Sequence, residues 1–286
     1  MANSSRVIFS KGKGGLPKIN LHSATSEAEI YFQGAHVTHF QRQGEPPLLF
    51  LSEHSKFEEG SAIRGGVPII FPWFGAKEGK PMHGFARNRA WELKEVLSDN
   101  DNITLVLVLP ESPEAGDLPK FTAEYWVTVG ETLSLELKIS NCSGENLSFE
   151  NCLHTYFTVG DISSISVAGL KGGEFLDKVD GFARKTEAND LIKISGETDR
   201  VYVSTTSTVE IIDPKLQRKI IIEKDGSDST VLWNPWIAKA KAMADFGDEE
   251  YLHMVCVESG NVSENKLTLS GGKSASLKNI FRTVKI

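Results

Sequence analysis

Two side chains suited to proton transfer, His154 and Glu258, lie about a hundred positions apart in the chain. Histidine exchanges protons at physiological pH, and a carboxylate in apolar surroundings has a raised pKa that lets it act as a base near neutrality. Taken singly, a strand histidine is more often structural, and a carboxylate at a strand end is more often solvated or paired with a lysine. The two residues therefore indicate acid–base chemistry only if the fold brings them together.

Basic side chains gather around a segment rich in proline and glycine, residues 60–91. Arg64 lies near its start, and His83, Arg87 and Arg89 lie near its end. Guanidinium groups match the geometry of phosphate with paired donors, and Gly65-Gly66 would let backbone N–H groups approach an anion. The segment therefore suits a local anion site, although a solvated loop whose arginines pair with surface carboxylates explains the same composition.

A third group of candidates consists of Asp199 and three tryptophans. Asp199 opens an alternating run in GETDRVYVS, where an aspartate commonly caps a turn. Trp73, Trp233 and Trp236 lie among the polar candidates. Aromatic faces commonly cover the apolar faces of sugars, but tryptophans are also ordinary core residues.

The elements that carry the two proton-transfer candidates are predicted to be strands, because their residues alternate. In the run 251–258, one face carries Leu252, Met254, Cys256 and Glu258, and the other carries His253, Val255 and Val257. In the run 147–159, Phe149, Leu153 and Phe157 form a core face, and Glu150, Cys152, His154 and Tyr156 form a more polar face. Glu258 is thus in phase with core residues, and His154 is placed to line a cleft.

The rest of the chain repeats short alternating runs separated by turn residues, which predicts an all-β sandwich or barrel with a few short helices. The first twenty residues read as an arm that becomes an edge strand, and 60–91 reads as a long ordered loop. The clearest helix follows Asn234 as N-cap and Pro235 as first residue, and ends before Gly247. Without a repeat or a linker, we expect residues 1–286 to form a single domain.

Composition excludes several classes of function. The 286 residues carry a net charge of −7, which disfavours general binding to nucleic acid or to anionic membranes. No apolar run reaches the roughly 18 residues of a membrane span. Three cysteines at irregular spacing suit a reducing compartment and offer no Cys-x-x-Cys metal site. We therefore expect a cytoplasmic monomer that acts on a small molecule, without a nucleic-acid or membrane partner.

Five segments in order resemble a known family: IRGGVPIIFPWFG, HGFARNRAWE, LHTYFTVGD, TDRVY and VLWNPWIAKAKAMADFGDEEYLHMVCVESGN. They extend from about residue 60 to residue 261. The sequence resembles the aldose 1-epimerase (galactose mutarotase-like) superfamily and, within it, the glucose-6-phosphate 1-epimerases. The resemblance implies an antiparallel β-supersandwich with a shallow cleft on one face.

The resemblance also implies roles for individual residues. Glu258 matches the general base of the family, His154 its general acid, and Asp199 a residue that binds sugar hydroxyls. Arg64 and Arg87 match its substrate-binding arginines.

The resemblance also implies that His83 lies in the same motif, beside the sugar. Met82 precedes His83, where some relatives carry a polar residue, and both are candidates for substrate binding. Arg89 is added from its charge alone as a further phosphate contact.

Together these features predict a mutarotase that interconverts the α and β anomers of a hexose 6-phosphate, with D-glucose 6-phosphate as the first candidate. Proton transfer alone needs no cofactor and no metal. One alternative is an aldose 1-epimerase for unphosphorylated galactose or glucose, and another is a non-catalytic carbohydrate-binding or sensor protein on the same fold. A glycosidase is less favoured because it usually needs two carboxylates that flank the bond, and only Asp199 could join Glu258 in that role.

Overall fold

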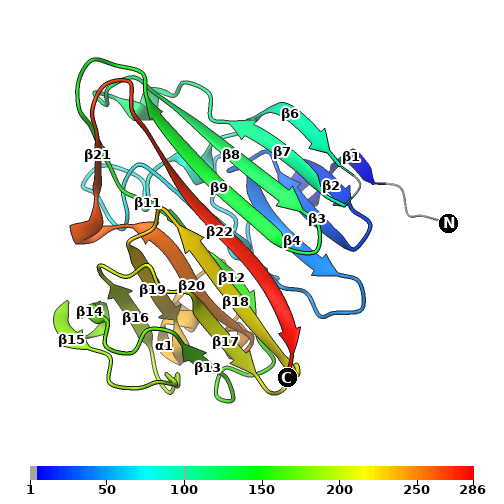
Figure 1. Ribbon diagram of the computed structural model, residues 1–286, viewed down its shortest axis with the longest axis vertical. Coiled ribbons are helices and arrows are strands. Elements are labelled where there is room, and N and C mark those ends of the chain that lie inside the picture. Colours follow the sequence, from blue (N-terminus) through cyan, green and yellow to red (C-terminus); the bar gives the residue numbers. More distant parts are fainter. Residues whose placement is uncertain (1–4, 100) are drawn as a thin grey trace.

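The computed structural model describes residues 5–99 and 101–286, and its architecture is dominated by antiparallel sheets (Figure 1). The N-terminal part forms a four-stranded sheet in the order β1 (Arg6–Lys11), β2 (Pro17–His22), β3 (Ser26–Tyr31) and β4 (His36–Arg42). The predicted N-terminal arm is therefore an edge strand, β1, that pairs with β2 alone in this sheet.

The sheet that carries the site, called here the site sheet, has eight strands. Its order is β15 (Ala183–Thr186), β14 (Glu174–Asp177), β16 (Thr198–Tyr202), β19 (Ser229–Asn234), β20 (Met254–Asn261), β11 (Asn151–Leu153) and β5 (Ile69–Ile70), and β12 (Tyr156–Thr158) also pairs with β20.

The second eight-stranded sheet is called here the back sheet. Its order is β13 (Ser166–Ala168), β17 (Val209–Asp213), β18 (Arg218–Asp225), β22 (Ser274–Lys285), β9 (Leu133–Asn141), β8 (Phe121–Val129), β7 (Ile103–Val108) and β6 (Glu92–Ser98). A separate pair joins β10 (Leu147–Phe149) to β21 (Leu267–Leu269). In Figure 1 the long red strand β22 runs between β18 and β9, with which it pairs.

Helical structure in the described residues is limited to α1 (Trp236–Ala242) and short 3-10 turns. The turns are η1 (Lys13–Gly15), η2 (Ala86–Asn88), η3 (Pro113–Ala115), η4 (Lys178–Asp180), η5 (Glu250–His253) and η6 (Ser263–Asn265). In this part of the chain, no helix has the length and hydropathy needed to cross a membrane.

The two faces of the site sheet belong to two different apolar clusters. On one face, Val255 and Val257 of β20 join Leu153 and Phe157 in the main core, which also takes in the inward residues of the back sheet. On the opposite face, alternate β20 residues such as Cys256 belong to a smaller apolar cluster. The alternation predicted from the sequence is therefore confirmed, and it separates the main core from the face that carries the site.

Three element boundaries differ from those expected. The run 251–258 begins with the turn η5, so β20 starts at Met254 and continues to Asn261. Leu252 therefore leaves the predicted face and packs against the main core. The long strand predicted for 147–159 is divided into β10, β11 and β12, with His154 and Thr155 in the break between the last two.

The predicted helix is also shorter than expected. It ends at Ala242, where the N–H of Met243 donates to the carbonyl of Ala240 at 3.1 Å. Asn234 is the last residue of β19 rather than a helix cap, but its side chain still accepts the N–H of Trp236 at 2.9 Å. The same amide group donates to the carbonyl of Met254 at 2.9 Å, and so ties the helix start to β20.

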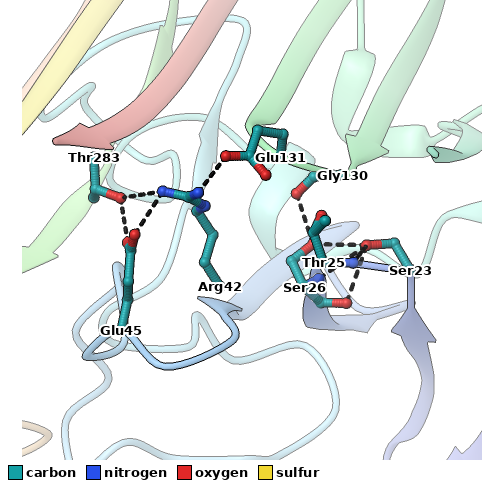
Figure 2. A network of polar contacts seen from close by, with 8 residues as sticks. All are labelled: Ser23, Thr25, Ser26, Arg42, Glu45, Gly130, Glu131 and Thr283. Carbon is teal, nitrogen blue, oxygen red and sulfur yellow. Dashed lines mark hydrogen bonds and ion pairs between the residues drawn. The ribbon is translucent and has the colours of Figure 1, made fainter. Parts of the chain in front are cut away.

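A polar network joins the N-terminal sheet to the back sheet (Figure 2). The buried hydroxyl of Ser26 on β3 donates to the carbonyl of Gly130, at the turn between β8 and β9, at 2.7 Å. Arg42 on β4 pairs with Glu45 at 2.5 Å and with Glu131 of the same turn. Thr283 of β22 donates to Glu45 and closes the network.

Candidate active site

A cavity of about 670 Å³ lies on the outer face of the site sheet. Its floor is made of alternate residues of the sheet, which fall into two cross-strand rows. Val201, Val231 and Glu258 form one row, and Asp199 and Trp233 belong to the next, in which the buried Cys256 pairs with Trp233 but does not line the cavity. The walls come from the segment 74–87, from η4 and its neighbours, and from α1. His154 and Glu258, far apart in the chain, both line this cavity.

Glu258 is the most deeply placed carboxylate in the cavity, with 1% of its surface exposed. Its Oε2 accepts a hydrogen bond from the thiol of Cys152 on the neighbouring strand β11, at 3.4 Å between oxygen and sulfur. Burial raises the pKa of Glu258 well above its ordinary value, and the nearby negative charge of Asp199 adds to the increase. This carboxyl group therefore has the raised proton affinity that a base near neutral pH requires.

His154 directly follows β11, and its ring is held on several sides. It stacks on Tyr156 with ring centroids 4.8 Å apart and an angle of 10° between the planes. Trp233 and His83 meet it edge-on at 5.9 Å and 5.8 Å. Burial lowers the pKa of His154 well below its usual value, and the neighbouring basic groups, such as Arg87, lower it further.

The proton-transfer pair is in direct contact, because His154 Nδ1 lies 3.3 Å from Glu258 Oε1. Burial disfavours the charged form of each group, so the contact joins a neutral imidazole to a carboxyl group of raised pKa. Nδ1 is shielded from solvent and makes no hydrogen bond with described residues, which leaves Nε2 as the ring nitrogen available to a ligand. The total charge of the pair is the same whether Glu258 is protonated beside a neutral imidazole or His154 is protonated beside an ionised carboxylate.

Arg87 provides an unbalanced positive charge in the cavity wall. It lies in η2, and its Nη2 donates to the carbonyl of Met82 at 2.8 Å. Its Nε is buried without a hydrogen-bond partner, and no carboxylate in the described chain lies within ion-pair distance of it. Burial lowers the pKa of Arg87 to about 10. A partly buried guanidinium without a counter-ion suits an anionic ligand.

Arg64, in contrast, is already held in place. Its Nη2 lies 3.1 Å and its Nε 3.2 Å from Oδ2 of Asp245, and its Nη1 donates to the hydroxyl of Tyr156 at 3.0 Å. These oxygens, Tyr156 first, raise the pKa of Arg64 above its usual range. Arg64 is thus a fixed charge at the cavity edge, oriented by the same tyrosine that stacks on His154.

Asp199 lies in the cavity floor next to the Trp233 position of β19 and is paired with lysines. Lys178 Nζ lies 3.0 Å from its Oδ2, and Lys239 Nζ lies 4.0 Å away. Lys178 also lies over the ring of Phe74, 5.5 Å from the centroid, and so extends across the cavity. The structure thus places Asp199 in the same cavity as His154 and Glu258.

Met82 and His83 both line the cavity. His83 has a left-handed backbone (φ 65°), and its Nδ1 accepts the N–H of Gly75 at 3.1 Å. Burial, together with the neighbouring cations, lowers the pKa of His83 to about 3, so the ring is neutral and presents an Nε2–H donor. Met82 offers an exposed apolar side chain, and its carbonyl orients Arg87.

The structure corrects the placement of Arg89. This residue is not among those that line the cavity, and its guanidinium pairs with Glu114 of η3 at 3.1 Å. Arg87 lies within η2, whereas Arg89 follows the turn with extended backbone and contributes to a smaller hollow. Charge clustering in the sequence could not distinguish the two arginines.

Sequence analysis did not identify Lys178 and Lys239 as site residues. Both reach the cavity from elements that border the site sheet, η4 and α1. Their sequence neighbourhoods are ordinary for surface lysines, so no local pattern marks them. Phe182, which is 60% exposed at the cavity edge, also has no local sequence pattern that marks it as a site residue.

Known proteins resemble this chain over most of its length. The model of the family described as "Aldose 1-epimerase" matches residues 17–282. The chain is 39% identical over 275 residues to a protein of Cenchrus ciliaris named "Putative glucose-6-phosphate 1-epimerase", which covers 92% of this chain and 83% of that protein. A protein of the same name from Escherichia coli K12 is 36% identical over 263 residues, or 91% of this chain and 87% of that protein.

Solved structures give the same assignment. The crystal structure of a "putative mutarotase (YeaD)" from Salmonella typhimurium superposes with a TM-score of 0.88 at 33% identity, over 95% of this chain and 91% of that chain. A galactose mutarotase-like protein from Clostridium acetobutylicum, at 16% identity, shares the fold with a TM-score of 0.77 over 99% of both chains. The predicted mutarotase-like fold is thus confirmed. The chain belongs to the aldose 1-epimerase family.

Proposed function

We propose that this protein interconverts the α and β anomers of a hexose 6-phosphate, with D-glucose 6-phosphate as the first candidate. The observation that carries the proposal is the contact of His154 with Glu258 in a cavity whose wall holds the unpaired guanidinium of Arg87. The pair suits ring opening, and the guanidinium suits a phosphate. The names of the relatives from Cenchrus ciliaris and Escherichia coli support the same substrate.

The proposed reaction moves two protons and leaves the protein unchanged. The Glu258 carboxylate removes the proton of the anomeric hydroxyl while protonated His154 donates a proton to the ring oxygen, and the C1–O5 bond breaks. The open aldehyde turns about its C1–C2 bond. Closure on the other face of C1 returns both protons to their donors.

In the reactive state, the imidazole of His154 is protonated and the carboxyl group of Glu258 is ionised. In the ligand-free site, burial and the positive charge of Arg87 disfavour protonation of His154. A phosphate dianion near Arg87 offsets this positive charge, and so raises the proton affinity of His154 when substrate binds. The phosphate would thereby help to create the acid that opens the ring.

Binding energy from the phosphate can also orient the reacting atoms. Arg87 would hold the phosphate, and the fixed guanidinium of Arg64 would limit its position. Lys178 would give up its contact with Asp199, and a sugar hydroxyl would bind the carboxylate instead. Asp199 would thereby fix the orientation of the sugar ring in the cavity. Interactions remote from C1 increase the rate when they orient the reacting groups.

The direct test follows anomer exchange of glucose 6-phosphate by NMR magnetisation transfer, with and without the protein. We expect the wild type to accelerate exchange. His154→Ala and Glu258→Gln should each lower the enzyme-dependent rate by about 10²–10⁴-fold, the usual contribution of a positioned acid or base. Wild-type rates in both variants would refute the acid–base assignment.

The same assay separates the alternative functions. Equal acceleration on free glucose or galactose would favour an epimerase of unphosphorylated sugars. Binding of glucose 6-phosphate in calorimetry, without any acceleration of exchange, would favour a sensor protein.

A further inference from the structure

Three side chains of types that can bind a metal ion meet at the cavity: His154 and Glu258 line it, and the buried Cys256 lies next to them without lining it. One donor atom from each of His154, Cys256 and Glu258 lies within 4.8 Å of the others, and all three residues are buried. Cys256 precedes Glu258 by two positions on β20, so both side chains are on the same face of the strand. The proposed reaction uses His154 and Glu258 and gives no part to the thiol.

One nitrogen in this group lacks a hydrogen-bond partner, and this supports a ligand between the three side chains. His154 Nδ1 is shielded from solvent and makes no hydrogen bond with described residues, although it lies 3.3 Å from Glu258 Oε1. Buried polar nitrogens are normally paired, and an unpaired one requires an explanation. A cation between this nitrogen and the carboxylate would satisfy both.

We propose that Zn²⁺ binds between His154, Cys256 and Glu258, and that bound zinc inhibits the enzyme. Thiolate, imidazole and carboxylate are the three ligand types that zinc takes in proteins. Three protein ligands leave the fourth tetrahedral position open, here toward the cavity. The ion would therefore be a reversible ligand of the site.

The geometry requires a small contraction. At zinc–ligand distances of about 2.0–2.3 Å, tetrahedral ligand atoms lie roughly 3.5 Å apart. Donor atoms that are up to 4.8 Å apart must therefore approach one another, by about 1 Å for the widest separation. Rotation of the side chains can supply this movement, and the cavity provides a path for the ion.

The charges of the ligands and of the neighbouring arginines determine how well the site accepts a cation. With the Cys256 thiolate and the Glu258 carboxylate as ligands, the ion and its site are neutral overall. Arg64 is paired with Asp245, so the main opposing charge is the unpaired guanidinium of Arg87.

Zinc binding must displace protons. The Cys256 thiol must ionise, and a protonated Glu258 must ionise as well, so zinc affinity should rise with pH. Zinc would also occupy the two groups that move protons in the proposed reaction. Inhibition should therefore compete with the sugar phosphate. This effect on turnover rests on the proposed function, whereas zinc binding does not.

The test is calorimetric titration of the full-length protein with zinc chloride, in a buffer that does not chelate zinc and with a reductant that contains no thiol. We expect one tight site per chain. Cys256→Ser should weaken it by more than about tenfold, the lower end of the loss caused by removing even an outer-shell partner. Cys152→Ser should retain it, because this neighbouring thiol contacts Glu258 but is not part of the group.

A second control addresses binding at the surface. His22 and His39 both lie 3.5 Å from Glu27 on the N-terminal sheet, at partly exposed positions that could attract zinc independently. His39→Ala should leave the tight site unchanged. If zinc binds Cys256→Ser as tightly as the wild type, or if His39→Ala removes the tight site, the proposal is wrong.

Spectroscopy tests the ligand directly. Cobalt(II) in the same site should show a near-ultraviolet thiolate charge-transfer band that Cys256→Ser and Cys256→Ala lack while circular dichroism shows both variants folded. Absence of the band in the wild type would exclude the thiolate ligand. In the NMR assay, zinc should slow anomer exchange by the wild type far more than by Cys256→Ser. Zinc binding that depends on Cys256, in a protein without anomer exchange, would support the metal site and refute the proposed function.

Discussion

Two arginines at neighbouring positions show how much the setting of a single residue matters. Arg89 has an ion-pair partner on an exposed surface, and such pairs contribute little to stability. Arg87 is buried at its Nε without a partner, at the wall of the cavity. The second setting is costly for the folded protein unless a ligand supplies the missing acceptor. Arg87 is therefore expected to be the residue that selects for phosphate.

Substitution of Arg87 by alanine tests this selection. Loss of one charge-assisted contact, worth about 1.5–3 kcal/mol, should raise KM for glucose 6-phosphate roughly 10–100-fold. The KM for free glucose should change little. Steady-state assays of anomer exchange with both sugars measure the difference.

Arg89→Ala is the matched control, since it removes the same charge two positions away and should leave both values near those of the wild type. An equal loss on the two sugars in Arg87→Ala would mean that this residue does not bind the phosphate.

At the same scale, the sequence indicated His154 and Glu258 for a physical reason. Their positions alternate in phase with residues of the smaller apolar cluster, such as Cys152 and Cys256. The strand pattern therefore placed both side chains on the face of the site sheet that carries this cluster. Lys178 had no such pattern. It comes to Asp199 only because η4 folds over the sheet, and that closure depends on contacts between distant segments.

Among the elements, the segment 60–91 contains little regular structure beyond β5 and η2, and contacts with neighbouring elements fix its start. Buried His36 at the start of β4 contacts the carbonyl of Gly65 through Nε2 at 2.7 Å. Gly65 and Gly66 have φ angles of 109° and 59°, and a Cβ on either would lie 2.5 Å or less from a backbone oxygen. The position of Arg64 thus depends on a close approach that only glycine permits.

Acid should loosen this attachment. Burial lowers the pKa of His36 from 6.5 to about 4. A depressed pKa contributes stability that is present above the unfolded value of 6.5 and is lost as pH falls toward 4, because the unfolded chain binds the proton first. The loss from this residue should reach about 3 kcal/mol.

Urea unfolding at pH 7 and pH 4.5 measures the effect. His36→Gln should be less stable than the wild type at pH 7 but should lose less stability on acidification. The other buried histidines, His83 and His154, act in the same direction, so only part of the dependence should disappear. His54→Gln, at an exposed position, should keep the full dependence; an unchanged profile in His36→Gln would contradict the assignment.

Element boundaries were the part of the fold that local pattern predicted least well. The strand expected over 147–159 is interrupted between β11 and β12 because the N–H of Thr155 donates back to the carbonyl of Leu153 at 2.9 Å rather than to β20. The strand expected from Tyr251 starts later, since the N–H of Leu252 bonds within η5 to Glu249 at 3.0 Å. Each break is made by a hydrogen bond whose partner the alternation of apolar residues does not reveal.

For the whole molecule, the sheets depend on a few polar contacts as well as on the core. The N-terminal sheet meets the back sheet through the network of Figure 2, in which the buried Ser26 hydroxyl reaches the carbonyl of Gly130. None of the residues in this junction lines the cavity. Stability and activity should therefore respond to it separately.

Ser26→Ala tests this separation. Removal of a buried donor should lower the free energy of unfolding by about 1–2 kcal/mol, because the carbonyl of Gly130 is left without its partner. Denaturant titration should show a lower midpoint with an unchanged slope. The rate of anomer exchange per folded molecule should not change.

Ser148→Ala removes an exposed hydroxyl contact to Thr268 and should cost far less than Ser26→Ala. Equal destabilisation by the two substitutions would show that the junction has no special role.

The two faces of the site sheet have a consequence for protein engineering. Along the strands of the site sheet, residues that face the main core alternate with residues that face the cavity. The side chains of the two sets therefore lie on opposite sides of the sheet. Substitutions on opposite faces should combine nearly additively when they share no partners. Directed evolution confined to the cavity walls, at residues 74–83 and 176–182, would then explore new sugars on an unaltered scaffold.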